Sequence, residues 1–341
     1  PFVISFSNLE ATIEFKISSE TKFPEDIIFF NSNARLSLSL SFFLKISPVD
    51  RCETFKKSEI TFTSNITPQI ISEIQNGSGV FLYPLRDVEI EVYFYVPENY
   101  NNESKIFFAM HGGGRDAEGV RNSMISAANQ YNYIIIAPKI DATNFPLGDQ
   151  YNLGNVYVDG DNPSEETLND ENDWTFSLIE PLFDSLKTTL NLSAENYNII
   201  GFSAGGQFVH RFILFKPDAR FSKAIVAAPG WYTVIDTNID FPYGFGNSIL
   251  DFNNVENLFS KEVYFIVGEL DNNPNAYGLR RNDYADAQGI TRLDRAIHFY
   301  NVSNNIALEN NYNFNWTLDI VPNTNHSWQP NLQYALYLIN N

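Results

Sequence analysis

The chain has 341 residues, of which 44% are hydrophobic and 18% are charged, and this composition is globular rather than disordered. Its length predicts one large domain or two. Asp and Glu number 41 against 22 Lys and Arg, and the resulting net charge of −19 argues against a nucleic acid or an anionic membrane as the main partner. The single cysteine excludes an internal disulfide and a multi-thiolate metal site.

No uninterrupted apolar run approaches 18 residues, so we expect no membrane span. The chain begins at Pro1 without an initiator methionine, and we expect that a signal peptide has been removed and that the protein is secreted or periplasmic. The segment 35–44 has some resemblance to a signal-peptide core. Its alternation of Leu and Ser, however, favours a strand.

The amino-terminal part of the chain has a hydrophobic period of two, which is typical of half-buried strands. Apolar residues alternate with polar ones over 9–17 and 36–46, and another strand is expected to begin near 60–62. We therefore predict a small β-rich, sandwich-like domain over residues 1–75. The alternative is that these strands extend the edge of the main sheet.

From residue 76 to 341, short apolar runs alternate with helical stretches, which predicts an α/β domain with a mostly parallel sheet covered on both faces. Such sheets place their sites at the carboxyl ends of the strands. The expected strands are 80–83, 88–96, 106–110, 133–137, 197–201, 224–228, 263–267 and 314–321, and the first two form an antiparallel pair. The expected helices are 117–131, 174–190, 204–215, 289–308 and 331–339.

Ser203 is the first candidate nucleophile, because it lies in a G-x-S-x-G sequence, Gly201 to Gly205, between an apolar strand and a helix. The flanking glycines allow a sharp turn that exposes the hydroxyl at the amino end of the helix. The alternative is a glycine-rich connector with an incidental serine.

A second motif, His111 followed by three glycines, comes directly after the strand at 106–110. Acyl transfer needs backbone N–H groups directed at the developing oxyanion, and glycines let the main chain turn them inward. We predict Gly113 or Gly114 as one donor and Ala204, the residue after the serine, as the other. We interpret His111 as a brace for this loop rather than as the base.

His326 is the expected general base. The chain has four histidines. His111 is assigned above, while His210 and His298 lie within expected helices. His326 lies in a polar loop just after the last strand, where a parallel sheet presents a catalytic base.

Asp271 is the expected carboxylate that orients this base, because it follows the strand at 263–267 at the same edge of the sheet. Glu269 is the nearest alternative. Asp141 also follows a strand, but it precedes the serine in the chain. The chain order Ser, Asp, His is that of the α/β-hydrolases.

The stretch from about Val80 to the carboxyl terminus resembles an α/β-hydrolase, on the sequences HGGGRD, GFSAGG, GELDNNP and PNTNHSW. Within that superfamily it is similar to bacterial secreted esterases of the polyhydroxyalkanoate-depolymerase and feruloyl-esterase type. The resemblance implies a serine carboxylic-ester hydrolase that needs no cofactor and acts on a small-molecule or polymeric ester. The segment 1–75 has no counterpart in this resemblance.

Three aromatic residues, Trp231, Tyr232 and Trp328, follow strands at the predicted site edge, and we expect them to contact an aromatic or extended acyl group. The alternative is that they cap the core. The acidic loop from Asp159 to Glu166 lacks the glycine and distal glutamate of an EF-hand, so we interpret it as solvated and expect no metal. The alternative is a structural Ca²⁺ near Asp159 and Asp161.

Two alternative functions remain open at this stage. A serine peptidase would use the same residues on an amide. A hydrolase-fold binding protein would be inert, although each expected member of the catalytic triad is present in the sequence.

Overall fold

The computed structural model describes residues 2–6, 27–31 and 68–340. Its contacts divide the chain into two units, Pro1–Thr67 and Pro68–Asn341. In the first unit, β1 (Phe2–Phe6) pairs in parallel with β2 (Ile27–Asn31). The strands expected over 9–17, 36–46 and 60–62 lie outside the described residues, so the domain over 1–75 stays a prediction.

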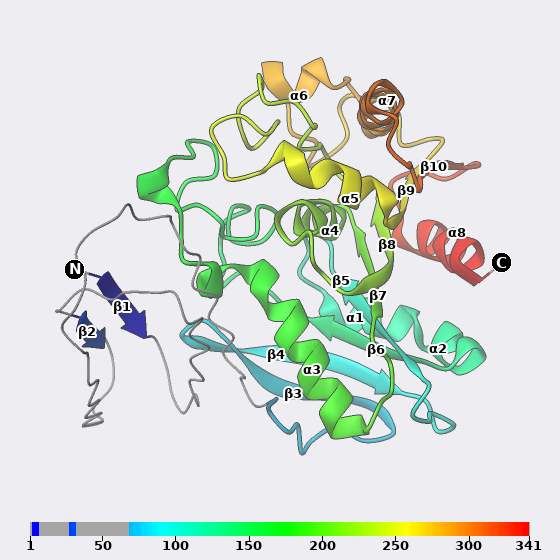
Figure 1. Cartoon of the computed structure of the whole chain (residues 1–341). Helices are drawn as coiled ribbons and strands as arrows, with labels where there is room; N and C mark the ends of the chain where they lie inside the picture. Colours follow the sequence, from blue (N-terminus) through cyan, green and yellow to red (C-terminus); the bar gives the residue numbers. More distant parts are fainter. Residues whose placement is uncertain (1, 7–26, 32–67, 341) are drawn as a thin grey trace. The chain divides into compact units, whose positions relative to one another are not determined.

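The second unit contains an eight-stranded sheet in the order β10-β9-β8-β7-β5-β6-β4-β3 (Figure 1). Six neighbouring strands are parallel, while β4 runs antiparallel to both β3 and β6. The expected α/β fold class with a mostly parallel sheet is therefore confirmed. The strands are β3 (Gly77–Leu85), β4 (Val88–Val96), β5 (Lys105–Met110), β6 (Tyr133–Pro138), β7 (Tyr197–Phe202), β8 (Phe221–Ala227), β9 (Glu262–Gly268) and β10 (Trp316–Val321).

Helices pack on both faces of this sheet (Figure 1). They are α1 (Ala117–Ser123), α2 (Ile125–Tyr131), α3 (Ile179–Leu190), α4 (Ala204–Phe215), α5 (Val255–Ser260), α6 (Asp283–Ala287), α7 (Arg292–Asn310) and α8 (Trp328–Asn340). Four 3-10 turns accompany them: η1 (Glu165–Thr167), η2 (Glu171–Asp173), η3 (Thr175–Leu178) and η4 (Phe252–Asn254). Along the sheet, α1 and α2 contact β4 and β6, α4 contacts β5, β7 and β8, and α7 contacts β9 and β10.

The burial pattern of the strands follows their position in the sheet. Every residue of β6 and β7 is buried, as expected for central strands covered on both faces. In β4, by contrast, the four even-numbered positions from Ile90 to Val96 are buried, while their neighbours are not. The change from alternating to continuous apolar sequence therefore marks the passage from the sheet edge to its centre.

Two expected helices differ from the structure. The stretch 117–131 divides at Met124 into α1 and α2. The helix expected from residue 174 begins as η3, and α3 starts only at Ile179. This start places Pro181 in the first turn of α3, where its missing N–H leaves no hydrogen bond unmade. The short helices α5 and α6 were not predicted.

Among the described residues, no helix is both long enough and apolar enough to cross a membrane.

Glycines bring the first turn of α4 into close contact with β5, β7 and β8. A Cβ atom on Gly205 would lie 2.2 Å from the Met110 carbonyl oxygen, and one on Gly206 would lie 2.5 Å from that of Ala227. A Cβ on Gly201 would lie 2.0 Å from the Gly205 oxygen. Each partner is backbone, which cannot move aside as a side chain would. The first turn of α4 is therefore seated directly against the carboxyl ends of β5, β7 and β8.

We predict that Gly205→Ala lowers the free energy of unfolding by about 1–2 kcal/mol, because overpacking against a fixed backbone, about 3 kcal/mol, outweighs the gain of roughly 1 kcal/mol that alanine brings to a helix. Urea unfolding followed by circular dichroism measures this change. The control is Gly148→Ala, because no atom lies within 4 Å of that Cβ position. Equal stability of the two variants would contradict the close packing.

Candidate active site

The carboxyl ends of the parallel strands meet at one edge of the sheet, and four of the sequence-predicted segments gather there. Gly112 follows β5, Ser203 follows β7, Asp271 lies three residues beyond β9, and His326 lies five residues beyond β10. The structure thus brings together segments that are far apart in the chain.

Ser203 occupies the turn between β7 and α4 in a strained backbone conformation, with φ 57° and ψ −113°. A residue other than glycine adopts such angles only where its surroundings enforce them, and such residues cluster at functional sites. The Ser203 N–H donates to the Ala227 oxygen at 2.9 Å, which ties the turn to β8. The side chain is partly exposed at the carboxyl edge.

His326 joins this serine to Asp271 in one hydrogen-bonded chain. Its Nε2 lies 3.0 Å from Ser203 Oγ, and its Nδ1 lies 2.6 Å from Asp271 Oδ2. Because the carboxylate can only accept, Nδ1 carries the proton, and Nε2 is free to accept from the hydroxyl. Asp271 is buried, with 3% of its side chain exposed, whereas 26% of the imidazole is exposed. This arrangement can withdraw a proton from the serine.

The two alternative acids are occupied elsewhere. Glu269 is exposed, and its Oε2 accepts from the Asn323 N–H at 2.9 Å. Asp141 accepts from the N–H groups of Thr143 and Asn144, which closes a local turn. Neither carboxylate bonds to His326.

His210 and His298 do not contact Ser203 through any hydrogen bond of the described residues. His210 is fully buried in α4, where its Nε2 accepts from the Thr233 N–H at 3.0 Å, and burial lowers its pKa far below the usual value. His298 is half-buried in α7, and burial lowers its pKa as well. Both positions agree with the helical placement expected from the sequence.

The glycine turn predicted to bind the oxyanion lies next to Ser203. A Cβ on Gly112 would lie 3.9 Å from the Ser203 Cβ. The Arg115 N–H donates to the Gly112 oxygen at 3.1 Å and closes a turn in which Gly113 and Gly114 are the central residues. No atom lies within 4 Å of the Cβ position of either glycine, so both border open space. Ala204 begins α4 on the other side of the serine.

His111 holds this turn in place. Its Nε2 accepts from the Ile140 N–H at 3.1 Å, so its Nδ1 donates to the Gly112 oxygen at 2.9 Å. The Tyr151 hydroxyl donates to the His111 oxygen at 2.6 Å, and the Arg115 guanidinium lies 4.5 Å from the Tyr151 ring. Burial lowers the pKa of His111 to about 4. A neutral, fully bonded imidazole is suited to bracing the loop.

The three aromatic residues expected to contact substrate occupy different environments. Trp328 is half-buried, and its ring packs edge-on against Phe202, which in turn stacks on His326 at 4.7 Å. Trp231 is only 5% exposed, with the Arg211 guanidinium 4.0 Å from its ring.

Tyr232 is buried, so the structure does not support the expected contact between this residue and a substrate. It is 0% exposed and stacks on Phe299 at 4.6 Å, which places its ring in the core between β9 and α7. Burial raises the pKa of its hydroxyl. Phe299 of α7 is the apolar partner of this ring. It lies far from Tyr232 in the chain, so the local sequence did not predict the contact.

The acidic loop is held by contacts within the protein. Asp159 accepts from the Asp161 N–H at 3.0 Å and from the Asn162 side chain, and Asp161 pairs with Arg280 at 3.0 Å. In residues 68–340, no three His, Cys, Asp or Glu side chains are grouped so as to hold a metal ion.

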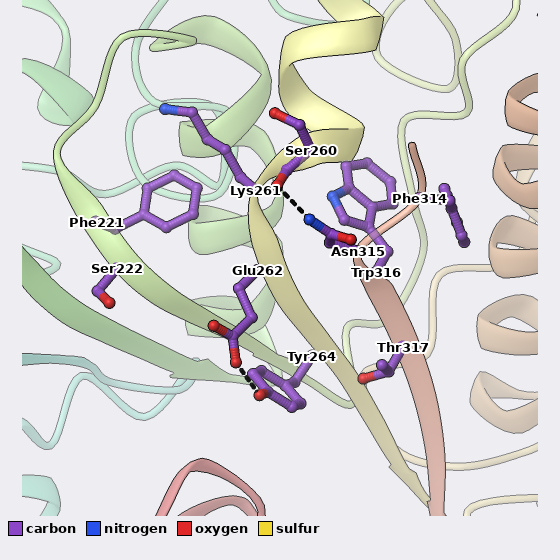
Figure 2. A pocket seen from close by; sticks show the side chains of 10 residues that line it. All are labelled: Phe221, Ser222, Ser260, Lys261, Glu262, Tyr264, Phe314, Asn315, Trp316 and Thr317. Carbon is purple, nitrogen blue, oxygen red and sulfur yellow. Dashed lines mark hydrogen bonds between the residues drawn. The ribbon is translucent and has the colours of Figure 1, made fainter. Parts of the chain in front are cut away.

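A cavity of about 660 Å³ lies at the opposite edge of the sheet, where β8, β9 and β10 begin (Figure 2). Phe221, Glu262 and Trp316, the first residues of these strands, line it. Figure 2 shows Asn315 donating to the Ser260 oxygen and Tyr264 bonded to Glu262. The cavity is therefore separate from the edge that carries Ser203.

Sequence reasoning missed two residues next to the histidine and its carboxylate. Arg292 Nη1 donates to Asp271 Oδ1 at 3.3 Å, although Arg292 belongs to α7 and no motif marks it. Phe202, which stacks on His326, is the variable residue of the G-x-S-x-G sequence. The only available signal for Phe202 was its apolar character at the end of a buried strand.

Among the solved structures that share this fold are two hydrolases. Poly(aspartic acid) hydrolase-1 from Sphingomonas sp. KT-1 is 34% identical with a TM-score of 0.74, over 79% of this chain and 100% of that one. The poly(3-hydroxybutyrate) depolymerase LpqC from Bordetella parapertussis is 26% identical with a TM-score of 0.72, over 78% of this chain and 89% of that one. No protein-family model and no curated protein matches the chain.

We predict that the free energy of unfolding falls in acid because His111 is buried as a neutral imidazole. The unfolded state takes up a proton near pH 6.5, whereas the folded state resists it down to about pH 4, so stability is lost as the pH falls through this interval. The loss amounts to about 3 kcal/mol. His111→Gln retains an acceptor for the Ile140 N–H but has no titrating group.

Unfolding free energies measured at several pH values between 7 and 4 test this prediction. Over this pH range, unfolding of His111→Gln should take up nearly one proton fewer than unfolding of the parent. Its unfolding free energy should therefore change less with pH. His298→Gln is the control, because that histidine is half-buried and should contribute less. An unchanged slope in His111→Gln would show that the folded state accepts the proton.

Proposed function

The chain belongs to the α/β-hydrolase superfamily of serine hydrolases, and from this premise we propose that it is a serine carboxylic-ester hydrolase. The observation that carries the proposal is the hydrogen-bonded chain from Asp271 through His326 to Ser203, with the serine in a strained turn. Such a chain activates a hydroxyl for attack on a carbonyl.

In the proposed reaction, Ser203 Oγ attacks the ester carbonyl carbon while His326 Nε2 takes the hydroxyl proton. Asp271 stabilises the resulting imidazolium. The carbonyl oxygen becomes an oxyanion, which the N–H groups of Ala204 and of Gly113 or Gly114 bind. The intermediate then collapses, the alcohol leaves with the proton from His326, and the acyl group stays on the serine.

Water completes the reaction. His326 removes a proton from the water as it attacks the acyl-enzyme, and a second oxyanion forms at the same donors. Collapse of this intermediate returns the proton to Ser203 and releases the carboxylic acid. No step requires a cofactor.

We propose a neutral ester, aromatic or polyester in type, as the substrate. One of the two similar structures is named a poly(3-hydroxybutyrate) depolymerase, which acts on a neutral polyester. The net charge of −19 favours neutral over anionic polymers, because like charges repel. The half-buried Trp328 is the aromatic side chain best placed to contact the acyl group. We also propose that the protein acts outside the cytoplasm.

Amide hydrolysis is the second candidate, and a specific observation favours it. The 34% identical structure is named a poly(aspartic acid) hydrolase, and the bonds that join poly(aspartic acid) are amides. An inert, ligand-binding hydrolase fold is the third candidate. A fluorophosphonate probe separates it from both enzymes, because a covalent adduct on Ser203 requires an activated hydroxyl.

We predict that Ser203→Ala and His326→Ala each lower kcat for p-nitrophenyl esters by at least about 10⁴-fold without loss of folding, because nucleophile and base act as a unit. Ser222→Ala is the control, since Ser222 lies at the opposite edge of the sheet. Parent-like turnover by Ser203→Ala would refute the assignment.

A matched ester and amide pair, with the same acyl group, distinguishes the first two candidates. We predict a kcat/KM ratio of at least about 10³ in favour of the ester, which corresponds to roughly 4 kcal/mol of differential transition-state stabilisation. Poly(aspartic acid) should not be cleaved. Its cleavage at a rate similar to that of a polyester would favour the amide hydrolase.

A further inference from the structure

We propose that Arg292 is a positioning residue for the hydrolysis described above, holding the Asp271 carboxylate oriented so that His326 presents Nε2 to the serine. The inference rests on the proposed function. It concerns a residue that contacts the carboxylate rather than the substrate.

The Asp271 carboxylate is shared between two donors. Oδ2 accepts from His326 Nδ1 at 2.6 Å, and Oδ1 accepts from Arg292 Nη1 at 3.3 Å. Within the part of the chain that the structure describes, these are the hydrogen-bond partners of the carboxylate. The side chains of Arg292 and Asp271 are 4% and 3% exposed, so water does little to solvate either charge.

A buried carboxylate with a neutral imidazole as its only partner is poorly stabilised as an anion. It then either takes up a proton or turns toward solvent. In both cases it ceases to fix the histidine, because Nδ1–H loses its charged acceptor. The guanidinium supplies the missing opposite charge and fixes the second oxygen, which removes the freedom of the carboxylate to rotate.

Arg292 is itself held firmly. It is the first residue of α7, and the Thr291 side chain caps the helix by accepting from the Asp294 N–H at 3.1 Å. Arg292 Nη2 donates to the Tyr277 oxygen at 3.2 Å. The Leu293 N–H donates to the Asp271 main-chain oxygen at 3.2 Å. The first turn of α7 therefore donates hydrogen bonds to both the side chain and the backbone of Asp271.

The charged and titratable groups around this contact come from several elements. Arg295, one turn along α7, donates to the Gly230 oxygen at 2.7 Å and to Asp286 of α6 at 2.9 Å. Arg281 also pairs with Asp286. Burial, and after it the charge of Asp271, raises the pKa of the Tyr232 hydroxyl. Arg292 is the guanidinium in contact with the carboxylate, which makes Arg295 a matched control.

Loss of the Arg292 guanidinium should therefore lower the rate, because the carboxylate no longer fixes the imidazole and the base is misplaced.

The rate constant for inactivation by a fluorophosphonate tests this effect without knowledge of the natural substrate. For Arg292→Gln we expect a rate about 10–100-fold lower at pH 8, because misplacement of a catalytic group by about 1 Å can cost about 100-fold.

Two further variants separate positioning from a merely structural role. Arg292→Lys keeps the charge but loses the fork, so it should recover most of the rate that Arg292→Gln loses and stay several-fold below the parent. Arg295→Gln should lower the melting temperature and leave the rate near that of the parent. If Arg292→Gln does not fold, the rate of Arg292→Lys decides, and a parent-like rate overturns the inference.

The remaining outcomes are equally distinct. A folded Arg292→Gln with the rate of the parent overturns the inference, as does an equal loss of rate in Arg295→Gln. If the parent itself forms no adduct on Ser203, the proposed function fails, and the inference fails with it. An adduct on the parent with unaltered kinetics in the Arg292 variants refutes the inference alone.

Discussion

The contact of the first turn of α4 with the carboxyl ends of β5, β7 and β8 is the constraint on which the rest of the structure depends. Gly201, Gly205 and Gly206 allow backbone to meet backbone at distances that no side chain would permit. This approach forces Ser203 into its strained conformation and aims the amino end of α4 at the carboxyl edge of the sheet. The loops that follow the neighbouring strands then determine which other residues lie next to the serine.

Residues from strands on either side of β7 in the sheet support the site. On the β5 side, buried and neutral groups brace the glycine turn: His111 bonds Gly112 and Ile140, and Tyr151 bonds the His111 oxygen. On the β9 and β10 side, charged groups hold the site, because the buried Asp271 lies between His326 and Arg292 and bonds to both. A neutral brace tolerates changes of pH near 7, whereas a charged one ties the geometry of the base to its electrostatics.

The net charge of −19 belongs to the chain as a whole, while the immediate surroundings of Asp271 are cationic. Arg292 and Arg295 enter the interior from one face of α7 and bond to Asp271 and Gly230 respectively. Overall acidity affects long-range encounters with polymers and products. Buried arginines act over a few ångströms, where the low polarity of the interior strengthens each contact.

The sequence alone determined the sheet, the turn at Ser203 and the placement of His326, because each depends on a local signal. Apolar runs identify strands, glycines permit close turns, and a loop after a strand lies at the carboxyl edge. Only the tertiary structure decided the surroundings of Tyr232, which Phe299 of a distant helix covers, and the cationic partner of Asp271, which α7 supplies. Such contacts join segments whose local patterns carry no information about each other. Packing of α7 against β9 is what brings them together.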